Sequence, residues 1–229
     1  MLKIYILAGG FGTRLSKVIK DVPKPMAPIG NIPFLEYQIN MIEKSIPEYE
    51  MTILTHHKSQ IIEDYFRDNT KVKVIREHKP LGTGGAIKNA IEILKYENNE
   101  PILVLNGDSY INTDFNKFIK NSHNNINILC TYQEDCERSS TIEIKNNIIK
   151  KFNKQGIRKK NSYISTGCYY FKDTLCVREY PDEIFMIEDF FEKIYNDIDL
   201  YAYTYTGDFI DIGVPKDYIK FCELMKNED

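Results

Sequence analysis

An apolar run that opens directly into a glycine-rich segment is the feature that most constrains how this chain folds. Residues Leu2 to Leu7 predict a buried strand, and a segment with three glycines, residues 9 to 12, follows at its carboxyl end. Glycines at such a point let backbone N–H groups close on a phosphate without obstruction by Cβ atoms, and such a concavity favours an anion. Arg14 and Lys24 add two positive charges to the same rim, so the segment predicts a nucleoside triphosphate site.

The spacing of this segment distinguishes it from two common phosphate-binding loops. A dinucleotide-binding fingerprint needs a third glycine where Leu15 stands, and an acidic residue about 20 positions further on. A P-loop ends in Gly-Lys-Ser/Thr, which Gly12-Thr13-Arg14 does not supply. An ordinary glycine-rich turn between strand and helix is the simpler alternative, and the Pro-Lys-Pro at 23–25 disfavours it.

The composition excludes several classes of protein. The 229 residues carry a net charge of −3 without a basic cluster, which argues against a nucleic-acid partner. No apolar run approaches the roughly 18 residues of a membrane span, and a signal peptide's basic region and cleavage site are missing. The five cysteines are odd in number and lack C-x-x-C spacing, which argues against structural zinc. We therefore expect a cytoplasmic protein that binds neither nucleic acid nor membrane.

Strand and helix patterns alternate through residues 1–125. Four apolar segments predict strands, at 3–7, 51–55, 72–76 and 102–105. Four segments predict helices, at 34–44, 58–66, 85–94 and 114–123. Strands separated by helices need right-handed crossovers, so this half predicts a mainly parallel, doubly wound sheet.

The pattern changes in residues 126–229. Short strands separated by polar turns are predicted at 126–132, 140–144, 148–152, 163–171 and 200–206. The turn at Asn146-Asn147 predicts a hairpin, and helices are expected near 188–195 and at 215–225. The chain contains no linker or repeat. Residues 1–229 therefore predict one domain, a Rossmann-like three-layer α/β/α fold with a mixed sheet, in which a nucleotide-binding half (1–125) lies beside a second half (126–229).

Two aspartates stand where a metal-bound triphosphate would need them. Asp108 follows the apolar strand at 102–105, and Asp211 occupies a similar junction between a strand and the helix at 215–225. Carboxylates at strand ends point into the crevice where α/β proteins bind ligands, and Mg²⁺ takes hard oxygen ligands that it shares with phosphates. For either aspartate alone, a turn or a helix N-cap is an alternative. Asp208 is the weaker candidate.

A second glycine-rich turn spans residues 80–86 and opens the predicted helix at 85–94. The backbone there could approach a base or a ribose closely. A tight loop that only starts a helix is the alternative.

With these segments in place, the chain resembles the sugar-1-phosphate nucleotidylyltransferases over nearly its whole length. The matching motifs are Leu7–Leu15, Pro23-Lys24-Pro25, Pro80–Thr83, Asn106-Gly107-Asp108, Thr166–Tyr169, Glu188-Asp189-Phe190 and Asp211-Ile212-Gly213. The first two are together highly specific, and the later motifs follow in the family's order. Within the family, the segment Pro23–Ile29 and the short length look like those of the D-glycero-α-D-manno-heptose 1-phosphate guanylyltransferases.

The resemblance implies a GT-A-like nucleotidyltransferase fold and a reaction. The phosphate oxygen of a sugar 1-phosphate would attack the α-phosphorus of a nucleoside triphosphate and release pyrophosphate. Arg14 would hold the pyrophosphate, Lys24 would bridge the two reacting phosphates, and Asp108 and Asp211 would carry Mg²⁺. By the same resemblance, the nucleotide would contact Leu7, Ala8, Gly9, Gly10, Gly12, Thr13, Glu77, Leu81, Gly82, Thr83, Asn106 and Gly107.

Glu77 favours GTP as the nucleotide. Relatives that use thymidine or uridine triphosphate tend to carry Gln at the corresponding position, five residues before Gly82. An ionised carboxylate only accepts hydrogen bonds, and the Watson–Crick edge of guanine presents two adjacent donors. The other bases offer at most one donor between or beside acceptors, so guanine fits best. A solvent-facing strand end is the alternative for Glu77.

The sugar phosphate would be bound by the second half of the chain. The resemblance implies that Glu188 accepts hydrogen bonds from sugar hydroxyls and that Gly167 lets the ring approach the backbone; a helix-terminal acid is the alternative for Glu188. Relatives usually carry Phe-x-Glu-Lys near the hairpin end, with the lysine on the sugar phosphate. This chain has Phe-Asn-Lys-Gln-Gly at 152–156, so Lys154 is displaced by one position and is only a candidate. Cys168 reads as a small core residue.

Several readings of the function stay open from the sequence. A heptose 1-phosphate guanylyltransferase comes first, with a mannose-1-phosphate guanylyltransferase as its nearest variant. A cytidylyl- or uridylyltransferase acting on another phosphorylated sugar, and a non-catalytic sensor of nucleotide sugars, are the alternatives. The Tyr- and Phe-rich second half could supply the interface of a homo-oligomer such as a dimer.

Overall fold

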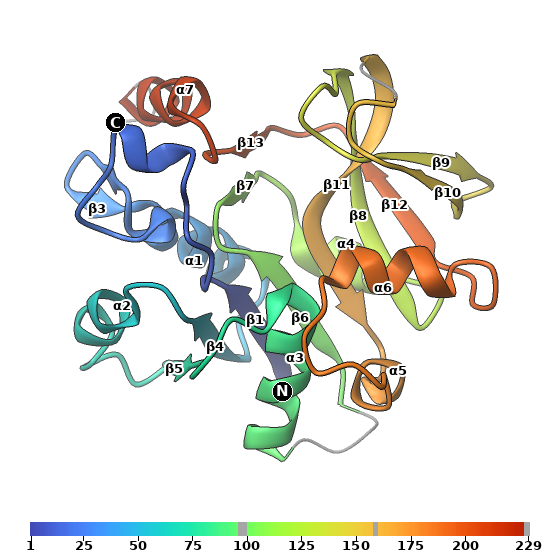
Figure 1. Ribbon diagram of the computed structural model, residues 1–229, viewed down its shortest axis with the longest axis horizontal. Helices are drawn as coiled ribbons and strands as arrows, with labels where there is room; N and C mark the ends of the chain where they lie inside the picture. The colour runs from blue at the N-terminus through green and yellow to red at the C-terminus, as the bar shows by residue number, and fades with distance from the viewer. Residues whose placement is uncertain (96–99, 158–159, 227–229) are drawn as a thin grey trace.

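A mixed β-sheet forms the centre of the molecule. The computed structural model describes residues 1–95, 100–157 and 160–226. Within these residues the sheet has nine strands in the order β5-β4-β1-β6-β11-β8-β12-β10-β9 (Figure 1). Strand order therefore follows neither half of the chain alone, because β11 returns to join the two halves.

The first half forms the parallel part of this sheet. The strands are β1 (Leu2–Leu7), β4 (Tyr49–Thr55), β5 (Val72–Arg76) and β6 (Ile102–Asn106). They are connected through α1 (Phe34–Ser45), α2 (Ser59–Tyr65) and α3 (Gly82–Leu94). The register places Leu7 beside both Leu54 and Asn106, so the loops after β1, β4 and β6 open at one edge of the sheet.

The second half continues the sheet with mixed strand directions. Its strands are β8 (Ile126–Asp135), β9 (Thr141–Lys145), β10 (Ile148–Asn153), β11 (Lys160–Phe171) and β12 (Tyr201–Tyr205). β9 and β10 form the predicted antiparallel hairpin, and β12 runs parallel to β8. β11 is antiparallel to both β6 and β8 and has an irregularity in its register between Ser165 and Cys168.

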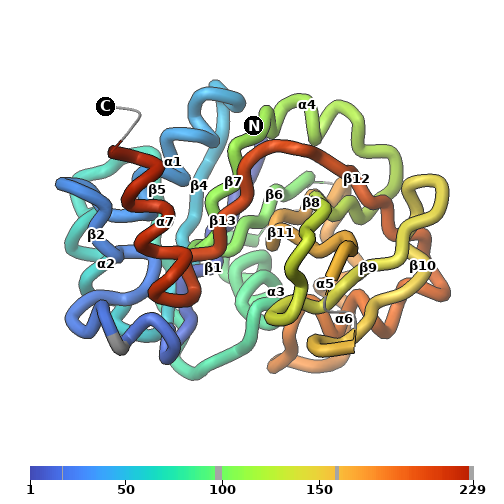
Figure 2. The backbone as a smooth tube through the Cα atoms, turned by 90° about the horizontal axis from the view of Figure 1, so that it is seen from above, coloured from blue at the N-terminus to red at the C-terminus, as the bar shows by residue number. Residues whose placement is uncertain are grey.

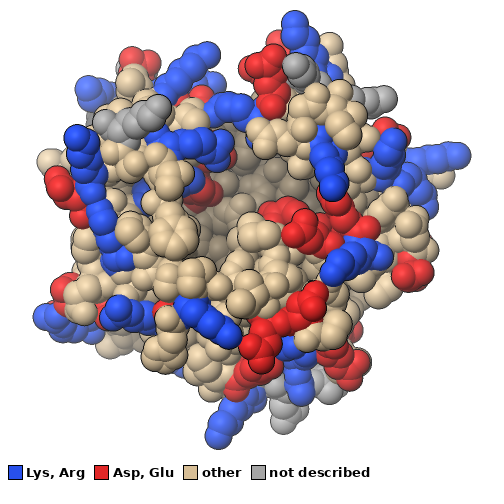
Figure 3. All heavy atoms as spheres, viewed as in Figure 1, with Lys and Arg blue, Asp and Glu red and all other residues tan. Residues whose placement is uncertain are grey.

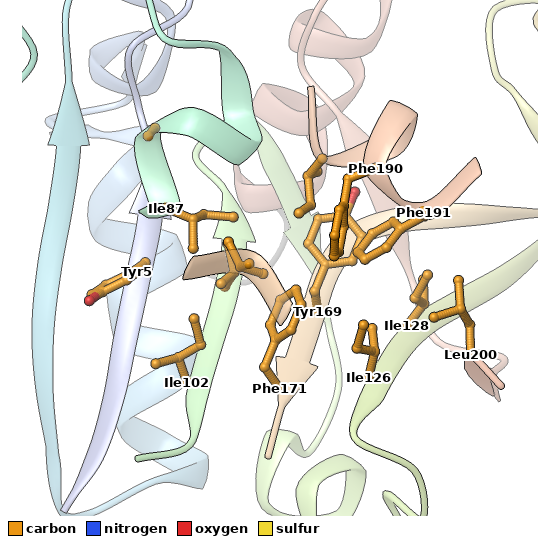
Figure 4. Close-up of a cluster of buried hydrophobic side chains, with 14 of the residues drawn as sticks. Tyr5, Ile87, Ile102, Ile126, Ile128, Tyr169, Phe171, Phe190, Phe191 and Leu200 are labelled. Carbon is orange, nitrogen blue, oxygen red and sulfur yellow. The ribbon is translucent and has the colours of Figure 1, made fainter. Parts of the chain in front are cut away.

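Helices cover both faces of the sheet, as the predicted three-layer α/β/α architecture requires. One face packs against α1, α2 and α4 (Phe115–Lys120), and the other packs against α3, α5 (Leu175–Arg178) and α6 (Ile187–Ile194). Figure 4 shows Phe190 and Phe191 of α6 packed beside Tyr169 and Phe171 of β11. Burial of large aromatic side chains in these two cores is the main source of the domain's stability.

The predicted element boundaries need correction at two helices. α3 begins at Gly82 rather than at residue 85, because the backbone of the preceding turn is already helical. α4 is shorter than the predicted 114–123: Asp114 is its N-cap and accepts a hydrogen bond of 3.0 Å from the Lys117 N–H, and the helix ends at Lys120.

Several short elements were not predicted. They are β2 (Pro28–Ile29), β3 (Ile32–Pro33), β7 (Ser109–Ile111), β13 (Phe209–Asp211), α5, and two 3₁₀ helices, Leu15–Lys17 and Lys24–Met26. Segments of two to four residues are too short to carry a periodicity that could distinguish strand from helix. The antiparallel pair β7–β13 matters most, because it connects the end of β6 to the C-terminal segment.

The C-terminal helix α7 (Pro215–Lys226) packs on the first half of the molecule, next to α1 in Figure 2. Its Phe221 is fully buried among Phe34, Tyr37 and Tyr110, with ring centroids 5.0, 5.6 and 4.8 Å away. This aromatic cluster anchors the chain immediately after β13. Among the described helices, none has the length and apolar character that crossing a membrane requires.

Phe221→Ala is expected to lower the free energy of unfolding by roughly 3–5 kcal/mol, because it leaves a cavity among three aromatic rings. Ile219→Ala, on the same helix at a side chain that is 51% exposed, is expected to change it by less than about 0.5 kcal/mol. Urea unfolding followed by circular dichroism measures both. Equal losses in the two variants would contradict the anchoring role of Phe221.

Candidate active site

A cavity of about 470 Å³ opens at the carboxyl ends of β1, β4 and β6. Figure 3 shows the surface hollowed at this place, between the two halves of the molecule. Its lining includes thirteen of the predicted site residues, namely Leu7, Ala8, Gly9, Gly10, Gly12, Lys24, Glu77, Leu81, Gly82, Thr83, Asn106, Asp108 and Glu188. The parallel strands thus bring together residues from distant segments of the chain.

The glycine-rich loop after β1 forms one wall of this cavity. Gly12 has a φ of +61°, a conformation that glycine adopts without steric cost, and its carbonyl accepts hydrogen bonds from Leu15 and Ser16 at the start of the first 3₁₀ helix. A Cβ added at Gly9 would lie 3.3 Å from the backbone nitrogen of His56 and 3.6 Å from Oε1 of Glu77. The loop backbone therefore lies directly against the neighbouring strand ends.

Two carboxylates meet at the end of the cavity opposite Glu77. Asp108 lies in the turn between β6 and β7, and the pairing of β7 with β13 places Asp211 opposite Ser109. Lys24 forms an ion pair with Asp108. Burial and the charge of Asp108 raise the pKa of Asp211, while Lys24, the N–H of Gly213 and Arg14 oppose the shift.

This arrangement fits a divalent cation. The two carboxylates supply the hard oxygen ligands that Mg²⁺ takes, and Mg²⁺ usually completes its shell with phosphates and water. The pKa of Asp211 is raised in part because two negative groups lie close together, a repulsion that a cation would relieve. Asp108 and Asp211 are therefore the residues that would hold Mg²⁺.

Glu77 lies at the other end of the cavity and does not face solvent. Only 6% of its surface is exposed, and its Oε2 accepts a hydrogen bond of 3.2 Å from the backbone N–H of Leu81. Burial raises the pKa of Glu77, while the Leu81 N–H and nearby His56 oppose the shift. A carboxylate buried at a cavity wall with one oxygen unpaired is suited to accept hydrogen bonds from a ligand.

The second glycine-rich turn has two separate roles in the structure. Leu81 and Gly82 line the cavity, in agreement with the expected approach of a ligand. Gly84 and Gly85 instead donate their N–H groups to the carbonyl of Phe185, at 3.0 and 3.2 Å. A Cβ at either position would overlap the segment that contains Phe185, so these two glycines serve packing.

Glu188 is held by two hydroxyl groups. Tyr169 donates to its Oε1 at 3.1 Å, and Thr83 donates to its Oε2 at 3.3 Å. The Thr83 hydroxyl also accepts a hydrogen bond of 2.8 Å from the N–H of Ile187. The start of α3 and the start of α6 are therefore joined at the cavity, and the carboxylate keeps lone pairs for a further ligand.

A second, polar cavity of about 210 Å³ adjoins the first, and Asn106 lines both. Three further predicted residues, Arg14, Gly167 and Asp211, line this second cavity. Arg14 and Lys24 were expected on one rim, but in this structure they line different cavities. Gly167 has a φ of +76° and packs against the side chain of Asn106.

Three predicted residues line neither cavity. Thr13 is exposed, and Gly107 is buried with its N–H bonded to the carbonyl of Leu7 at 2.9 Å. Lys154 is exposed in the turn after β10. Cys168 is fully buried, which raises the pKa of its thiol and agrees with the prediction that it is a core residue.

The sequence analysis missed several residues of the two cavities. The first is also lined by Phe11, Pro25, Leu54, His56, Pro80, Ala86 and Met186, and the second by Ser109, Gln133, Asp135, Arg138, Ser139, Ile164, Ser165, Thr166, Phe209, Ile210, Asp217 and Lys220. His56 could have been found, because it directly follows β4 at the same sheet edge. Arg138, which pairs with Asp217 at 2.5 Å, reaches the cavity from a loop and carries no comparable signal.

Comparisons with known proteins place the chain among nucleotidyltransferases. The model of the nucleotidyl transferase family matches residues 3–228. The chain is 35% identical over 223 residues to a D-glycero-alpha-D-manno-heptose 1-phosphate guanylyltransferase of Campylobacter jejuni, covering 96% of this chain and 98% of that protein. It is 31% identical over 226 residues to one of Aneurinibacillus thermoaerophilus, covering 96% of each chain.

Solved structures agree with these matches. The crystal structure of HddC from Yersinia pseudotuberculosis complexed with GMP-PN has a TM-score of 0.83 and 32% sequence identity, over 98% of this chain and 100% of that one. A glucose-1-phosphate thymidylyltransferase structure from Bacillus anthracis, itself assigned only as putative, has a TM-score of 0.82 at 20% identity, covering 98% of this chain and 95% of that one, and shares the fold. The predicted fold class is confirmed.

Gly167→Ala is expected to cost roughly 2–5 kcal/mol of stability, because it combines a left-handed backbone conformation with an overlap against Asn106. Gly156→Ala is the matched control: its φ is +85°, but nothing lies within 4 Å of the added Cβ. It is expected to cost only about 1–2 kcal/mol. Thermal unfolding compares the two, and an equal loss would contradict close packing at Gly167.

Proposed function

The chain belongs to the nucleotidyl transferase family, and from this premise we propose that it is a sugar-1-phosphate guanylyltransferase that joins GTP to D-glycero-α-D-manno-heptose 1-phosphate. One observation carries the proposal. A single cavity has the buried carboxylate of Glu77 at one end and the Lys24–Asp108 ion pair at the other, which suits a guanine base and a polyphosphate respectively. The names of the relatives support the choice of sugar.

The reaction needs no covalent intermediate on the protein. An oxygen of the sugar 1-phosphate would attack the α-phosphorus of GTP in line, forming the GDP-sugar while the bond to pyrophosphate breaks. Catalysis of such a step is mostly positioning and electrostatic stabilisation, because charge spreads over the phosphoryl oxygens. The Lys24 ammonium, held at Asp108, would offset the repulsion between two phosphate groups, and Arg14 would bind the departing pyrophosphate.

Mg²⁺, held by Asp108 and Asp211, would supply charge neutralisation for the phosphates. The loop of residues 9–12 would supply backbone N–H groups to the triphosphate, and its lack of side chains at Gly9 and Gly10 leaves room for close approach. Thr13, Gly107 and Lys154 stay predictions from the sequence resemblance.

Recognition of guanine would depend on Glu77. Its free oxygen and the second lone pair of the other can accept the N1–H and N2–H₂ groups of guanine. A base without adjacent donors would leave a buried carboxylate unsatisfied, which costs on the order of 1–3 kcal/mol or more.

Recognition of the sugar would depend on Glu188. Tyr169 and Thr83 hold its two oxygens, so the carboxylate is positioned before the sugar arrives. Vicinal hydroxyl groups of a sugar ring can both donate to such a group. Gly167 would let the ring approach the backbone.

The test is pyrophosphate release with each of the four nucleoside triphosphates against a panel of sugar 1-phosphates, with Mg²⁺ present or chelated. We expect turnover with GTP and heptose 1-phosphate that requires the metal. Mannose 1-phosphate is the competing substrate, because mannose-1-phosphate guanylyltransferases are among the relatives. Turnover with UTP or CTP alone would overturn the choice of base, and nucleotide binding without any turnover would favour a sensor.

Asp108→Asn is expected to lower kcat about 10³-fold or more, because it removes a carboxylate at the site of charge development. The matched control is Asp208→Asn, an exposed aspartate three residues before Asp211, for which we expect nearly wild-type rates. Steady-state kinetics at saturating Mg²⁺, together with thermal unfolding, separate lost chemistry from lost folding. A wild-type rate in Asp108→Asn would remove this residue from the site.

Glu77→Gln is expected to raise the KM for GTP about 10- to 100-fold relative to UTP, because the amide presents a donor to the donors of guanine. In the wild type, the raised pKa of Glu77 predicts that the KM for GTP increases as the pH falls, since the neutral carboxyl group carries a proton where an acceptor is needed. The variant should lose this pH dependence. Glu183→Gln, at an exposed side chain, is the control, and an unchanged GTP-to-UTP ratio in Glu77→Gln would show that the base is recognised elsewhere.

A further inference from the structure

Gln38 is a buried amide that contacts the backbone on both sides of Asp108. It lies on α1, is 1% exposed, and directs its Nε2 group at two carbonyl oxygens. The distances are 2.6 Å to the oxygen of Asn106 and 2.7 Å to the oxygen of Ser109. Both hydrogens of the amide are therefore used on the turn between β6 and β7.

The orientation of this amide follows from its partners. The opposite orientation would place Oε1 against two carbonyl oxygens, with no donor between them. In the observed orientation Oε1 is buried and has no hydrogen-bond partner among the described residues. A buried acceptor left unpaired is costly, so the two donated hydrogen bonds must outweigh this cost.

The turn that Gln38 holds carries the candidate metal site. Asp108 lies between Asn106 and Ser109, and its own carbonyl accepts a hydrogen bond of 3.0 Å from the N–H of Ile212. Ser109 is paired in register with Asp211 across β7 and β13. The spacing of the two carboxylates therefore depends on the backbone that Gln38 contacts.

We propose that Gln38 is a positioning residue for Asp108 and Asp211: its amide fixes the turn at Asn106–Ser109 so that both carboxylates can bind one divalent cation together with the nucleotide phosphates. This proposal rests on the proposed function. Groups that orient metal ligands commonly alter metal affinity or activity about 10- to 100-fold when replaced. A displacement of about 1 Å at a reacting group costs about 10²-fold.

The chain contains a matched control for a purely structural role. Asn127, at the start of β8, is 0% exposed, and its Nδ2 donates to the carbonyls of Asn124 and Tyr170 at 2.8 and 3.3 Å. Its Oδ1 is also buried without a partner among the described residues. The chemistry is thus the same as at Gln38, but Tyr170 pairs with Leu103, which lies on β6 at a distance from its carboxyl end.

The experiment compares Gln38→Met, Gln38→Glu and Asn127→Leu with the wild type in the full chain. Methionine keeps the size of glutamine without its donors, and glutamate replaces the donors with an acceptor or a single proton. The measurements are the thermal midpoint, kcat and KM for GTP, and binding of Mn²⁺ by electron paramagnetic resonance in the presence of a non-hydrolysable GTP analogue. Binding of the analogue without metal, in EDTA, is measured by calorimetry.

We expect all three variants to lower the thermal midpoint, but only the Gln38 variants to affect the metal. For Gln38→Met, the Kd for Mn²⁺ should rise about 10-fold and kcat should fall about 10- to 100-fold, with the metal-free affinity for the analogue unchanged. Gln38→Glu should show a larger effect. Equal kinetic losses in Asn127→Leu and Gln38→Met, or wild-type Mn²⁺ binding in both Gln38 variants, would overturn the proposal.

Asp108→Asn, measured in parallel, separates this proposal from the proposed function. If Asp108→Asn abolishes turnover and Mn²⁺ binding while the Gln38 variants behave as wild type, only the role of Gln38 is wrong. If Asp108→Asn itself keeps turnover, the proposed metal site is wrong, and the role of Gln38 is wrong with it.

Discussion

The parallel pairing of β1 with β4 and β6 is the constraint on which the rest of the structure depends. Because Leu7, Leu54 and Asn106 lie level across three strands, the loops that follow must open at one edge of the sheet. That edge receives the glycine-rich loop, Glu77 and Asp108 from segments that are far apart in the sequence. A shift in this register would separate these groups by one or more residue spacings, which would dismantle the cavity.

Polar groups inside the fold are used mainly to hold this edge in shape. The carbonyl of Phe185 accepts the N–H groups of Gly84 and Gly85, so the start of α3 is satisfied within the protein. Thr83 connects the same turn to Glu188, and Gln38 connects α1 to the turn at Asp108. A site whose side chains are already oriented loses less entropy when ligands bind.

Agreement between sequence and structure depends on element length. The strand at 72–76 and the hairpin around Asn146-Asn147 could be predicted because their patterns extend over several residues. β7 and β13 could not, since each has three residues and is stabilised only by its pairing with the other. The positions of Glu77 and Asp108 could be inferred from the strand ends, whereas Arg138 reaches the second cavity from a loop of residues 136–140.

By itself, the sequence determined the order of strands and helices, the glycine-rich loop after β1 and the residue types for a nucleotide and a metal, because these depend on local patterns along the chain. Only the tertiary structure decided that Asp211 lies beside Asp108, that Arg14 and Lys24 line different cavities and that Glu77 is buried. The physical reason is that distances between side chains from distant segments are set by strand register and core packing, which no local pattern records.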